Sequence, residues 1–335
     1  MAHHHQAVFV RERVDTPDGD FIDFDWLAPR GPVAGSGTGR ADRIDAQLAH
    51  TAARRWMRDA DRRALAASGT TNALILFHGL EGGSGSPYAQ AIAHHFLARN
   101  WAVVVAHFRG CSGFPNRMAR AYHSGDSADL AFMLMTARKH LPRARWHGVG
   151  ISLGGNALLK CLGDHPQTTA WLTAVAGICV PLDLVACGNR LSTSPIVRRL
   201  CAVYFLRPMK RKLIEKAQRF PGTVDVLRAS RIKTLRDFDD LYTAPLHGYE
   251  NALDYWTRAS SKSILKSLHV PALVLNARND PFVPAPSLPA TRDCSDEVLL
   301  HQPARGGHVG FTSGPFPGHS DWLPARIERF FRTGS

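Results

Sequence analysis

Short apolar runs alternate with longer segments of helical periodicity along most of the chain. Runs with so few polar interruptions are typical of parallel strands that are covered on both faces. The runs that we expect to form strands span residues 73–77, 101–106, 146–151, 174–180, 272–276 and 297–300. The helices that we expect between and after them span residues 87–98, 127–140, 154–162 and 322–331. We therefore predict an α/β fold, with a mostly parallel central sheet and helices on both of its faces.

The N-terminal part of the chain departs from this alternation. Residues 8–14 and 21–27 alternate apolar and polar positions around a turn-rich segment, which predicts a hairpin within residues 1–27. Residues 28–71 are rich in Gly, Ala, Arg and Asp, and we expect a mobile basic insertion there, with an Arg-rich helix near 46–66.

A second departure separates two of the expected strands. Residues 182–268 form a long, mostly helical and basic stretch, the pattern expected of a cap inserted into a sheet domain. Residues 72–181 and 269–335 would then form the core domain. Residues 198–236 contain 12 Lys or Arg against two acids, within a chain of net charge +13. This charge fits a solvated helical face or a contact with an anionic membrane, whereas a nucleic-acid role lacks interleaved aromatic residues and is not expected.

Composition narrows the class of protein further. With 44% hydrophobic and 21% charged residues, the chain has the profile of a globular protein rather than a disordered one. Its six cysteines show neither zinc-site nor disulfide spacing, so we expect no metal and no cofactor. No run approaches the roughly 18 apolar residues of a membrane span, and no signal peptide is recognisable. We therefore expect a cytoplasmic protein.

One short motif indicates nucleophilic chemistry. Residues 150–154 read Gly-Ile-Ser-Leu-Gly and match G-x-S-x-G, in which two glycines let a strand turn sharply into a helix and expose the serine. The motif alone is weak evidence, but here an expected strand precedes it and an expected helix follows it. We therefore predict that Ser152 is a catalytic nucleophile.

A serine nucleophile needs a base, and the base needs a carboxylate that orients it. In a fold of this kind the chain order is Ser, then Asp or Glu, then His. Asp280 follows an expected strand 128 residues after Ser152, and His308 lies in a glycine-flanked loop after the next one. Asp280 alone would suit a turn, and His308 alone would suit a structural role. Their order and placement favour a catalytic triad.

The oxyanion that forms during acyl transfer needs backbone N–H donors. The N–H of Leu153 lies at the head of the helix after Ser152, and the N–H of Leu80 lies in the loop after the first core strand. We expect both to bind the oxyanion, with His78 and Gly79 of the same loop lining the substrate site. Arg109 either borders the acyl pocket or fastens its own loop to the sheet. Neither a Walker A motif nor a dinucleotide-binding G-x-G-x-x-G accompanies these loops.

The assembled motifs resemble those of the YheT-like α/β-hydrolases. The resemblance covers most of the chain outside residues 28–71, although the family's N-terminal arm is not recognisable. It rests on Phe77–Gly82, His107–Gly113, Tyr122–Gly125, Gly150–Asn156, Phe238–Leu241, Asn279–Phe282 and Gly306–Phe311. It implies an α/β-hydrolase fold with a helical cap, a Ser152, Asp280 and His308 triad, and carboxylesterase activity.

Three functional hypotheses therefore remain open. The first is a serine carboxylesterase that acts on small-molecule or lipid esters through an acyl-enzyme. The second is a lipase or phospholipase whose basic cap docks on anionic membranes. The third is an inactive scaffold that keeps the fold and binds a partner through its cap.

Overall fold

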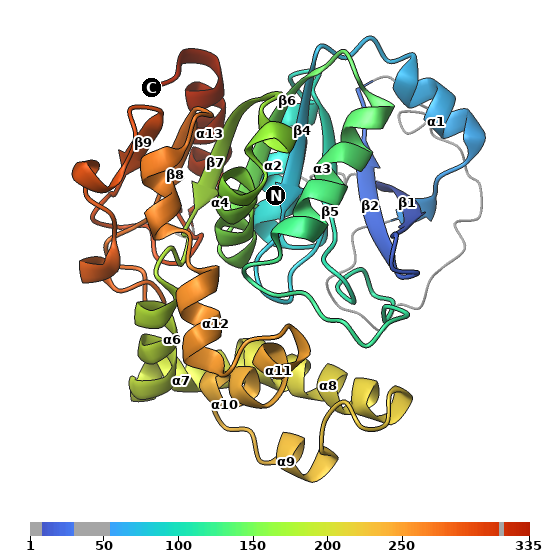
Figure 1. Cartoon of the computed structure of the whole chain (residues 1–335). Coiled ribbons are helices and arrows are strands. Elements are labelled where there is room, and N and C mark those ends of the chain that lie inside the picture. The colour runs from blue at the N-terminus through green and yellow to red at the C-terminus, as the bar shows by residue number, and fades with distance from the viewer. Residues whose placement is uncertain (1–8, 30–53, 315–317) are drawn as a thin grey trace.

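The computed structural model describes residues 9–29, 54–314 and 318–335. In this part of the chain nine strands form one sheet in the order β3-β1-β2-β5-β4-β6-β7-β8-β9 (Figure 1). The strands are β1 (Phe9–Asp15), β2 (Phe21–Leu27), β3 (Arg54–Trp56), β4 (Asn72–Phe77), β5 (Ala102–Ala106), β6 (Arg145–Ile151), β7 (Leu172–Ile178), β8 (Ala272–Leu275) and β9 (Val298–His301). Strand β2 is antiparallel to both β1 and β5, and the other neighbours run parallel. The predicted mostly parallel sheet is confirmed.

Helices cover both faces of the sheet, because successive side chains of a buried strand point to opposite sides. Along β4, Ala73, Ile75 and Phe77 join one apolar cluster, and Leu74 and Leu76 join the other. The helices of the core domain are α1 (Asp59–Ala66), α2 (Pro87–Leu97), α3 (Ser127–His140), α4 (Leu153–Asp164), α5 (Pro166–Thr169) and α13 (Trp322–Thr333). Side chains of α1, α3 and α4 pack in the first cluster, and those of α2 and α13 pack in the second.

Residues 54–66 of the expected N-terminal insertion pair with or pack against the sheet. Residues 30–53 lie outside the described part of the chain, but β3 pairs with the edge of β1 and α1 follows it. Leu65 of α1 enters the main core, and Arg55 forms an ion pair with Asp61 at the start of α1. The prediction of a mobile segment is therefore wrong for residues 54–66, because strand pairing and apolar burial hold them. Only Asp59–Ala66 of the expected helix near 46–66 is helical among the residues described.

Between β7 and β8 the chain forms helices that gather below the sheet in Figure 1, and we call residues 182–268 the cap. Two small apolar clusters of its own stabilise it. Its elements are α6 (Leu184–Thr193), α7 (Pro195–Cys201), η2 (Ala202–Leu206), α8 (Arg207–Arg219), α9 (Val226–Ser230), α10 (Leu235–Phe238), η3 (Asp239–Thr243), α11 (Ala244–Leu246), α12 (Ala252–Ala259) and η4 (Lys262–Ser267). After β8 come two short turns, η5 (Ala285–Ser287) and η6 (Thr291–Asp293).

Buried polar contacts join the cap to the core domain. The Asn156 amide of α4 is fully buried and donates to the carbonyl oxygens of Ser124 and Ala259. Its own oxygen accepts hydrogen bonds from the N–H and hydroxyl of Ser261. Lys216 of α8 reaches the Arg120 carbonyl at 2.7 Å. The cap is therefore fixed to the helix that follows Ser152 as well as to a loop of the core.

Candidate active site

Ser152 lies at a sharp turn between β6 and α4. Its backbone has φ 52° and ψ −118°, a conformation that a residue with a side chain rarely adopts. The flanking glycines make the turn possible. A Cβ on Gly150 would lie 2.5 Å from the Gly155 Cα, and one on Gly154 would lie 2.5 Å from the Phe77 carbonyl oxygen. The motif thus matches its local structure, with the serine held in a strained turn.

The structure brings Ser152, His308 and Asp280 together. The loop after β9 carries His308, whose Nε2 lies 3.0 Å from the Ser152 Oγ. The loop after β8 carries Asp280, whose Oδ2 lies 2.8 Å from the His308 Nδ1. The Asp280 side chain is fully buried and that of His308 is 16% exposed. Hydrogen bonds of this length allow a proton to move between the hydroxyl and the imidazole while the carboxylate orients the ring.

Neighbouring loop groups hold the carboxylate and the imidazole in place. The Oδ1 atom of Asp280 accepts hydrogen bonds from the backbone N–H groups of Phe282 and Val283. The Asn279 side chain accepts a hydrogen bond from the Gly307 N–H at 2.9 Å, which ties the loop after β8 to the loop of His308. Asp280 therefore keeps one oxygen for its own loop and the other for the imidazole.

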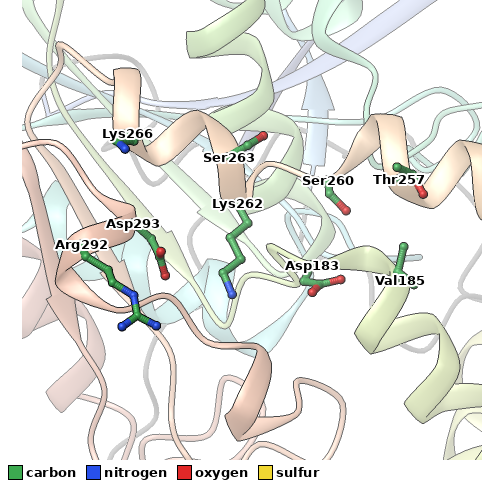
Figure 2. Close-up of a pocket in the computed structure, with 9 residues that line it drawn as sticks. All are labelled: Asp183, Val185, Thr257, Ser260, Lys262, Ser263, Lys266, Arg292 and Asp293. Atoms are coloured by element: carbon green, nitrogen blue, oxygen red, sulfur yellow. The ribbon is translucent and has the colours of Figure 1, made fainter.

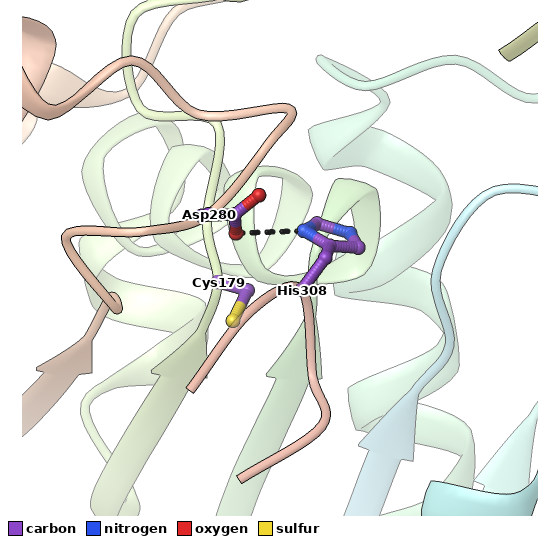
Figure 3. A group of neighbouring side chains, drawn as sticks. All are labelled: Cys179, Asp280 and His308. Atoms are coloured by element: carbon purple, nitrogen blue, oxygen red, sulfur yellow. Dashed lines mark hydrogen bonds and ion pairs between the residues drawn. The ribbon is translucent and has the colours of Figure 1, made fainter. Parts of the chain in front are cut away.

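Cys179 lies beside this pair, and Figure 3 shows all three side chains. Their potential metal-ligand atoms lie within 4.8 Å of one another. A metal would need the thiolate, but burial, and then the negative charge of Asp280, raise the pKa of the Cys179 thiol. The sulfur also accepts a hydrogen bond from the Val309 N–H at 3.2 Å. The group therefore suits proton transfer with a supporting thiol better than metal binding.

Two backbone N–H groups near Ser152 are free to bind an anion. Leu153 is the first residue of α4, and Leu80 lies in the loop of residues 78–83 that follows β4, here called the oxyanion loop. Within the described residues neither N–H donates a hydrogen bond, although the N–H groups of Gly79 and Glu81 donate to Tyr88 and Tyr122. A Cβ on Gly79 would lie 3.4 Å from the Ser152 Cβ, so this loop runs directly past the serine.

Glu81 anchors the oxyanion loop and was missed by the sequence analysis. It has a positive φ of 57° and accepts a hydrogen bond from the Tyr122 hydroxyl at 2.9 Å. Its other carboxylate oxygen lies 2.8 Å from the Lys212 Nζ of cap helix α8. The Gly-Leu-Glu-Gly-Gly motif was a usable signal for this residue, but nothing in the sequence paired it with a lysine 131 residues away.

The His78 side chain packs beneath the oxyanion loop and does not line the substrate site. It is fully buried, with Nδ1 2.8 Å from the Gly79 carbonyl oxygen and Nε2 accepting the Phe108 N–H. Burial, and then the charge of His107, lower the pKa of His78 to about 3, so the ring is neutral and its Nδ1 donates. The expected substrate contact does not hold for this side chain. Gly79 itself remains adjacent to Ser152.

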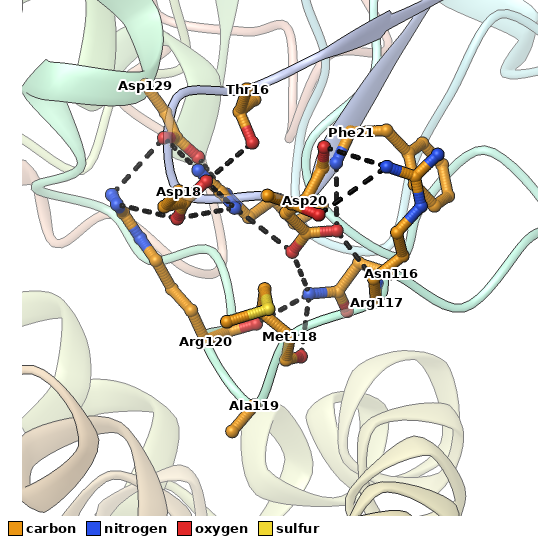
Figure 4. Close-up of polar contacts among 12 residues, drawn as sticks. Thr16, Asp18, Asp20, Phe21, Asn116, Arg117, Met118, Ala119, Arg120 and Asp129 are labelled. Atoms are coloured by element: carbon orange, nitrogen blue, oxygen red, sulfur yellow. Dashed lines mark hydrogen bonds and ion pairs between the residues drawn. The ribbon is translucent and has the colours of Figure 1, made fainter.

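Arg109 is likewise not at the substrate site. Its side chain is 2% exposed and binds both carboxylate oxygens of Asp129, at 2.6 and 2.8 Å. It also forms ion pairs with Asp18 and Asp20 in the turn between β1 and β2. Figure 4 shows these two aspartates together with Asp129. All of its donors face carboxylates, because three acidic side chains converge on one buried guanidinium. The expected contact with the acyl pocket is therefore wrong for Arg109. Its ion pairs fit the alternative, in which the side chain attaches its own loop to the sheet.

Two hollows lie near the cap, and neither contains Ser152. One of about 490 Å³ is lined by Asp183, Lys262, Lys266, Arg292 and Asp293 among others (Figure 2). Its central groups already have partners, since Lys262 donates to the Ser287 carbonyl and Asp183 caps α6. The other, of about 440 Å³, lies against Asp280.

Aromatic side chains separate the catalytic candidates from the cap. The centroid of the Phe282 ring lies 4.9 Å from that of the His308 ring, in an edge-to-face arrangement. The ring centroid of Phe205, in cap element η2, lies 5.7 Å from that of Phe282. Phe282 of the core domain therefore lies beside the imidazole and in contact with a cap residue, and the sequence alone did not reveal this contact.

Comparison with known proteins agrees with this fold. A family described as alpha/beta hydrolase fold matches residues 72–315. YheT of Escherichia coli (strain K12) is 32% identical over 324 residues, which cover 96% of this chain and 84% of that protein. The chain therefore belongs to the α/β-hydrolase family, and to its YheT-like members, as its motifs predicted.

Two further matches are more distant. The monoacylglycerol lipase of Saccharomyces cerevisiae is 30% identical over 245 residues, covering 71% of this chain and 54% of that protein. A solved structure of DcsB in complex with its substrate analogue superposes with a TM-score of 0.56 at 13% identity, covering 98% of this chain and all of that one. The latter likeness concerns the fold alone.

Proposed function

We propose that this protein is a serine hydrolase that cleaves carboxylic esters through an acyl-enzyme intermediate. The observation that carries the proposal is the pair of hydrogen bonds from Ser152 to His308 and from His308 to Asp280, at 3.0 and 2.8 Å. A strained serine, a base within reach and a buried orienting carboxylate are the parts that acyl transfer requires.

The reaction proceeds in two steps. The Ser152 Oγ attacks the ester carbonyl carbon while His308 Nε2 takes the hydroxyl proton, and the N–H groups of Leu80 and Leu153 stabilise the negative oxygen. The tetrahedral species then collapses, and the imidazolium gives its proton to the departing alkoxide. In the second step His308 activates a water that releases the acid. Asp280 keeps the Nδ1 proton in place throughout.

The relatives support esters as the substrate class. The yeast relative is named a monoacylglycerol lipase, and its identity of 30% extends over 71% of this chain. Small-molecule and lipid esters both fit a site that places an aromatic wall beside the imidazole. We therefore take a carboxylic ester with an apolar acyl group as the substrate class.

Replacing the nucleophile tests the proposal. Ser152→Ala should lower hydrolysis of p-nitrophenyl butyrate by roughly 10⁴-fold or more, because removal of the nucleophile of a triad costs up to about 10⁶-fold in kcat. Ser263→Ala is the matched control, since Ser263 is exposed and outside the triad. Equal rates for wild type and Ser152→Ala would contradict the proposal.

An inactive scaffold is the competing class. A fluorophosphonate probe forms a covalent bond only with an activated serine, so the proposal expects labelling of wild type and none of Ser152→Ala. Absence of label on both proteins would favour the scaffold.

A further inference from the structure

The cap presents an exposed apolar helix face beside the active site. Four large side chains are accessible on α7 and η2, with exposed fractions of 77% for Ile196, 37% for Leu200, 55% for Val203 and 66% for Tyr204. Their spacing of four, three and one residues places them on one face of a continuous helix. Val197, Cys201 and Leu206 of the same segment are buried in the protein. Adjacent apolar side chains exposed in this way mark an interaction surface rather than ordinary surface residues.

The same segment carries exposed basic side chains. Arg198, Arg199 and Arg207 are exposed, and within the described residues none of them forms an ion pair. No Asp or Glu occurs anywhere from residue 184 to residue 214. Apolar side chains flanked by unpaired arginines are the composition of a helix that lies in the interface of an anionic bilayer. A protein partner would need acidic and apolar groups in one fixed arrangement that matches this face. An anionic lipid surface offers negative headgroups and apolar acyl chains at every position of the helix on it.

The same helix contacts a side chain that lies beside the catalytic candidates. Phe205 directly follows Tyr204, and its ring is joined through Phe282 to the ring of His308, at 5.7 and 4.9 Å. Two ring contacts therefore connect this helix to the side chain that we propose as the catalytic base. No helix in the part of the chain described here has the length and apolar character needed to span a bilayer.

We propose that the helix face formed by Ile196, Leu200, Val203 and Tyr204, with Arg198, Arg199 and Arg207 around it, docks on anionic lipid membranes and admits lipid esters to the active site. The admission of esters rests on the proposed function, whereas the docking does not. The arginines hold the cap at the lipid headgroups, and the apolar side chains enter the acyl boundary.

Vesicle flotation tests docking separately from catalysis. The full chain carrying Ser152→Ala is mixed with vesicles of phosphatidylcholine alone or with 30% phosphatidylglycerol, a composition chosen as roughly that of an anionic leaflet. We expect the protein to float with the anionic vesicles, and the bound fraction to fall as salt is raised. Equal flotation with both vesicles, or none with either, would overturn the proposal and leave the esterase assignment untouched.

Matched variants locate the surface. Arg198→Gln with Arg199→Gln should weaken binding to anionic vesicles roughly tenfold or more. Arg143→Gln with Arg145→Gln removes the same charge at the amino end of β6, remote from Ser152 at its carboxyl end, and should change binding about twofold or less. Ile196→Ser with Tyr204→Ser should weaken binding similarly, whereas Leu253→Ser, at a 45% exposed position on α12, should not.

Thermal unfolding checks that each variant is folded when its vesicle binding is compared with that of wild type. All of these positions are exposed, so melting temperatures should stay close to that of wild type. If the control variants lost as much binding as the α7 variants, the attraction would be a property of net charge and the proposed face would be wrong.

Discussion

Lys212 of the cap and Glu81 of the oxyanion loop form an ion pair, with 2.8 Å between Nζ and Oε2. The Glu81 side chain is 11% exposed and that of Lys212 is 38% exposed. Tyr122 binds the same glutamate through its carboxylate and its backbone N–H. One cap residue thus contacts the loop that carries Leu80, whose N–H we propose as an oxyanion donor, so the cap helps to position this loop.

Breaking this pair should lower turnover more than substrate affinity. We expect Lys212→Met and Glu81→Gln each to reduce kcat on p-nitrophenyl butyrate about tenfold with KM changed about twofold or less, because the displaced N–H acts mainly in the transition state. Steady-state kinetics measure both constants. Arg236→Gln, which breaks the surface pair with Asp240, is the control. A rise in KM at constant kcat would show that the pair only shapes the binding surface.

Asp280→Asn tests which carboxylate orients the imidazole. An asparagine amide could donate a hydrogen bond to the His308 Nδ1, which would hold the imidazole in the tautomer that cannot accept the Ser152 proton. We expect turnover at neutral pH to fall about 10⁴-fold. Asp296→Asn, at an exposed position before β9, should leave turnover unchanged. Wild-type turnover in Asp280→Asn, measured on the same ester, would mean that another carboxylate serves His308.

Arg109→Gln should destabilise the fold without changing substrate binding. Removing the guanidinium leaves buried Asp20 without an ion-pair partner and buried Asp129 with Arg120 alone, which costs roughly 3–5 kcal/mol. Urea unfolding measures this loss, and KM of the folded variant should equal that of wild type. Arg117→Gln breaks an exposed pair with Asp15 and should cost less than about 1 kcal/mol. A stable variant with raised KM would restore the substrate role that the structure contradicts.

His147 should make the protein less stable in acid. It lies in β6 against the rings of Trp101 and Phe331, and burial lowers its pKa from 6.5 to about 4. Between these values the unfolded chain binds the proton and the native protein does not, so stability falls as the pH decreases through this window. The contribution lost is up to about 3 kcal/mol.

The substitution His147→Phe isolates this contribution. Urea unfolding midpoints at pH 7 and pH 4.5 should differ less in the variant than in wild type, because phenylalanine takes up no proton. His269→Gln, at an exposed position, should keep the wild-type difference. Identical pH dependence in wild type and His147→Phe would show that the buried ring titrates normally.

The sequence was sufficient for features encoded by neighbouring residues. Apolar runs identified β4 and β6 to within one residue at their starts, and helix α3 at both ends. Gly150, Ser152 and Gly154 identified the strained turn, because a strand, a glycine pair and a helix must follow one another there. Chain order then selected Asp280 and His308 among many acidic and histidine residues.

The sequence failed where contacts join distant segments. Residues 54–56 carry no strand-like apolar run, yet they pair with β1 because that edge was open. Strand β7 ends at Ile178 rather than at residue 180, since Cys179 has a φ of 51°. The His78 side chain was assigned to the substrate, and Arg109 was given the acyl pocket as one of two roles, because both adjoin active-site motifs. Adjacency in sequence does not fix where a side chain points.

Local pattern thus determined the class of fold, the turn at Ser152 and the order of the three candidate catalytic residues. Tertiary structure decided their distances, the ion pair from Lys212 to Glu81 and the aromatic contact of Phe205 with Phe282. The physical reason is that backbone preference and burial act over a few residues and leave a periodic signal. Contacts between loops depend on how separate elements pack, and that packing leaves no periodic trace in the chain.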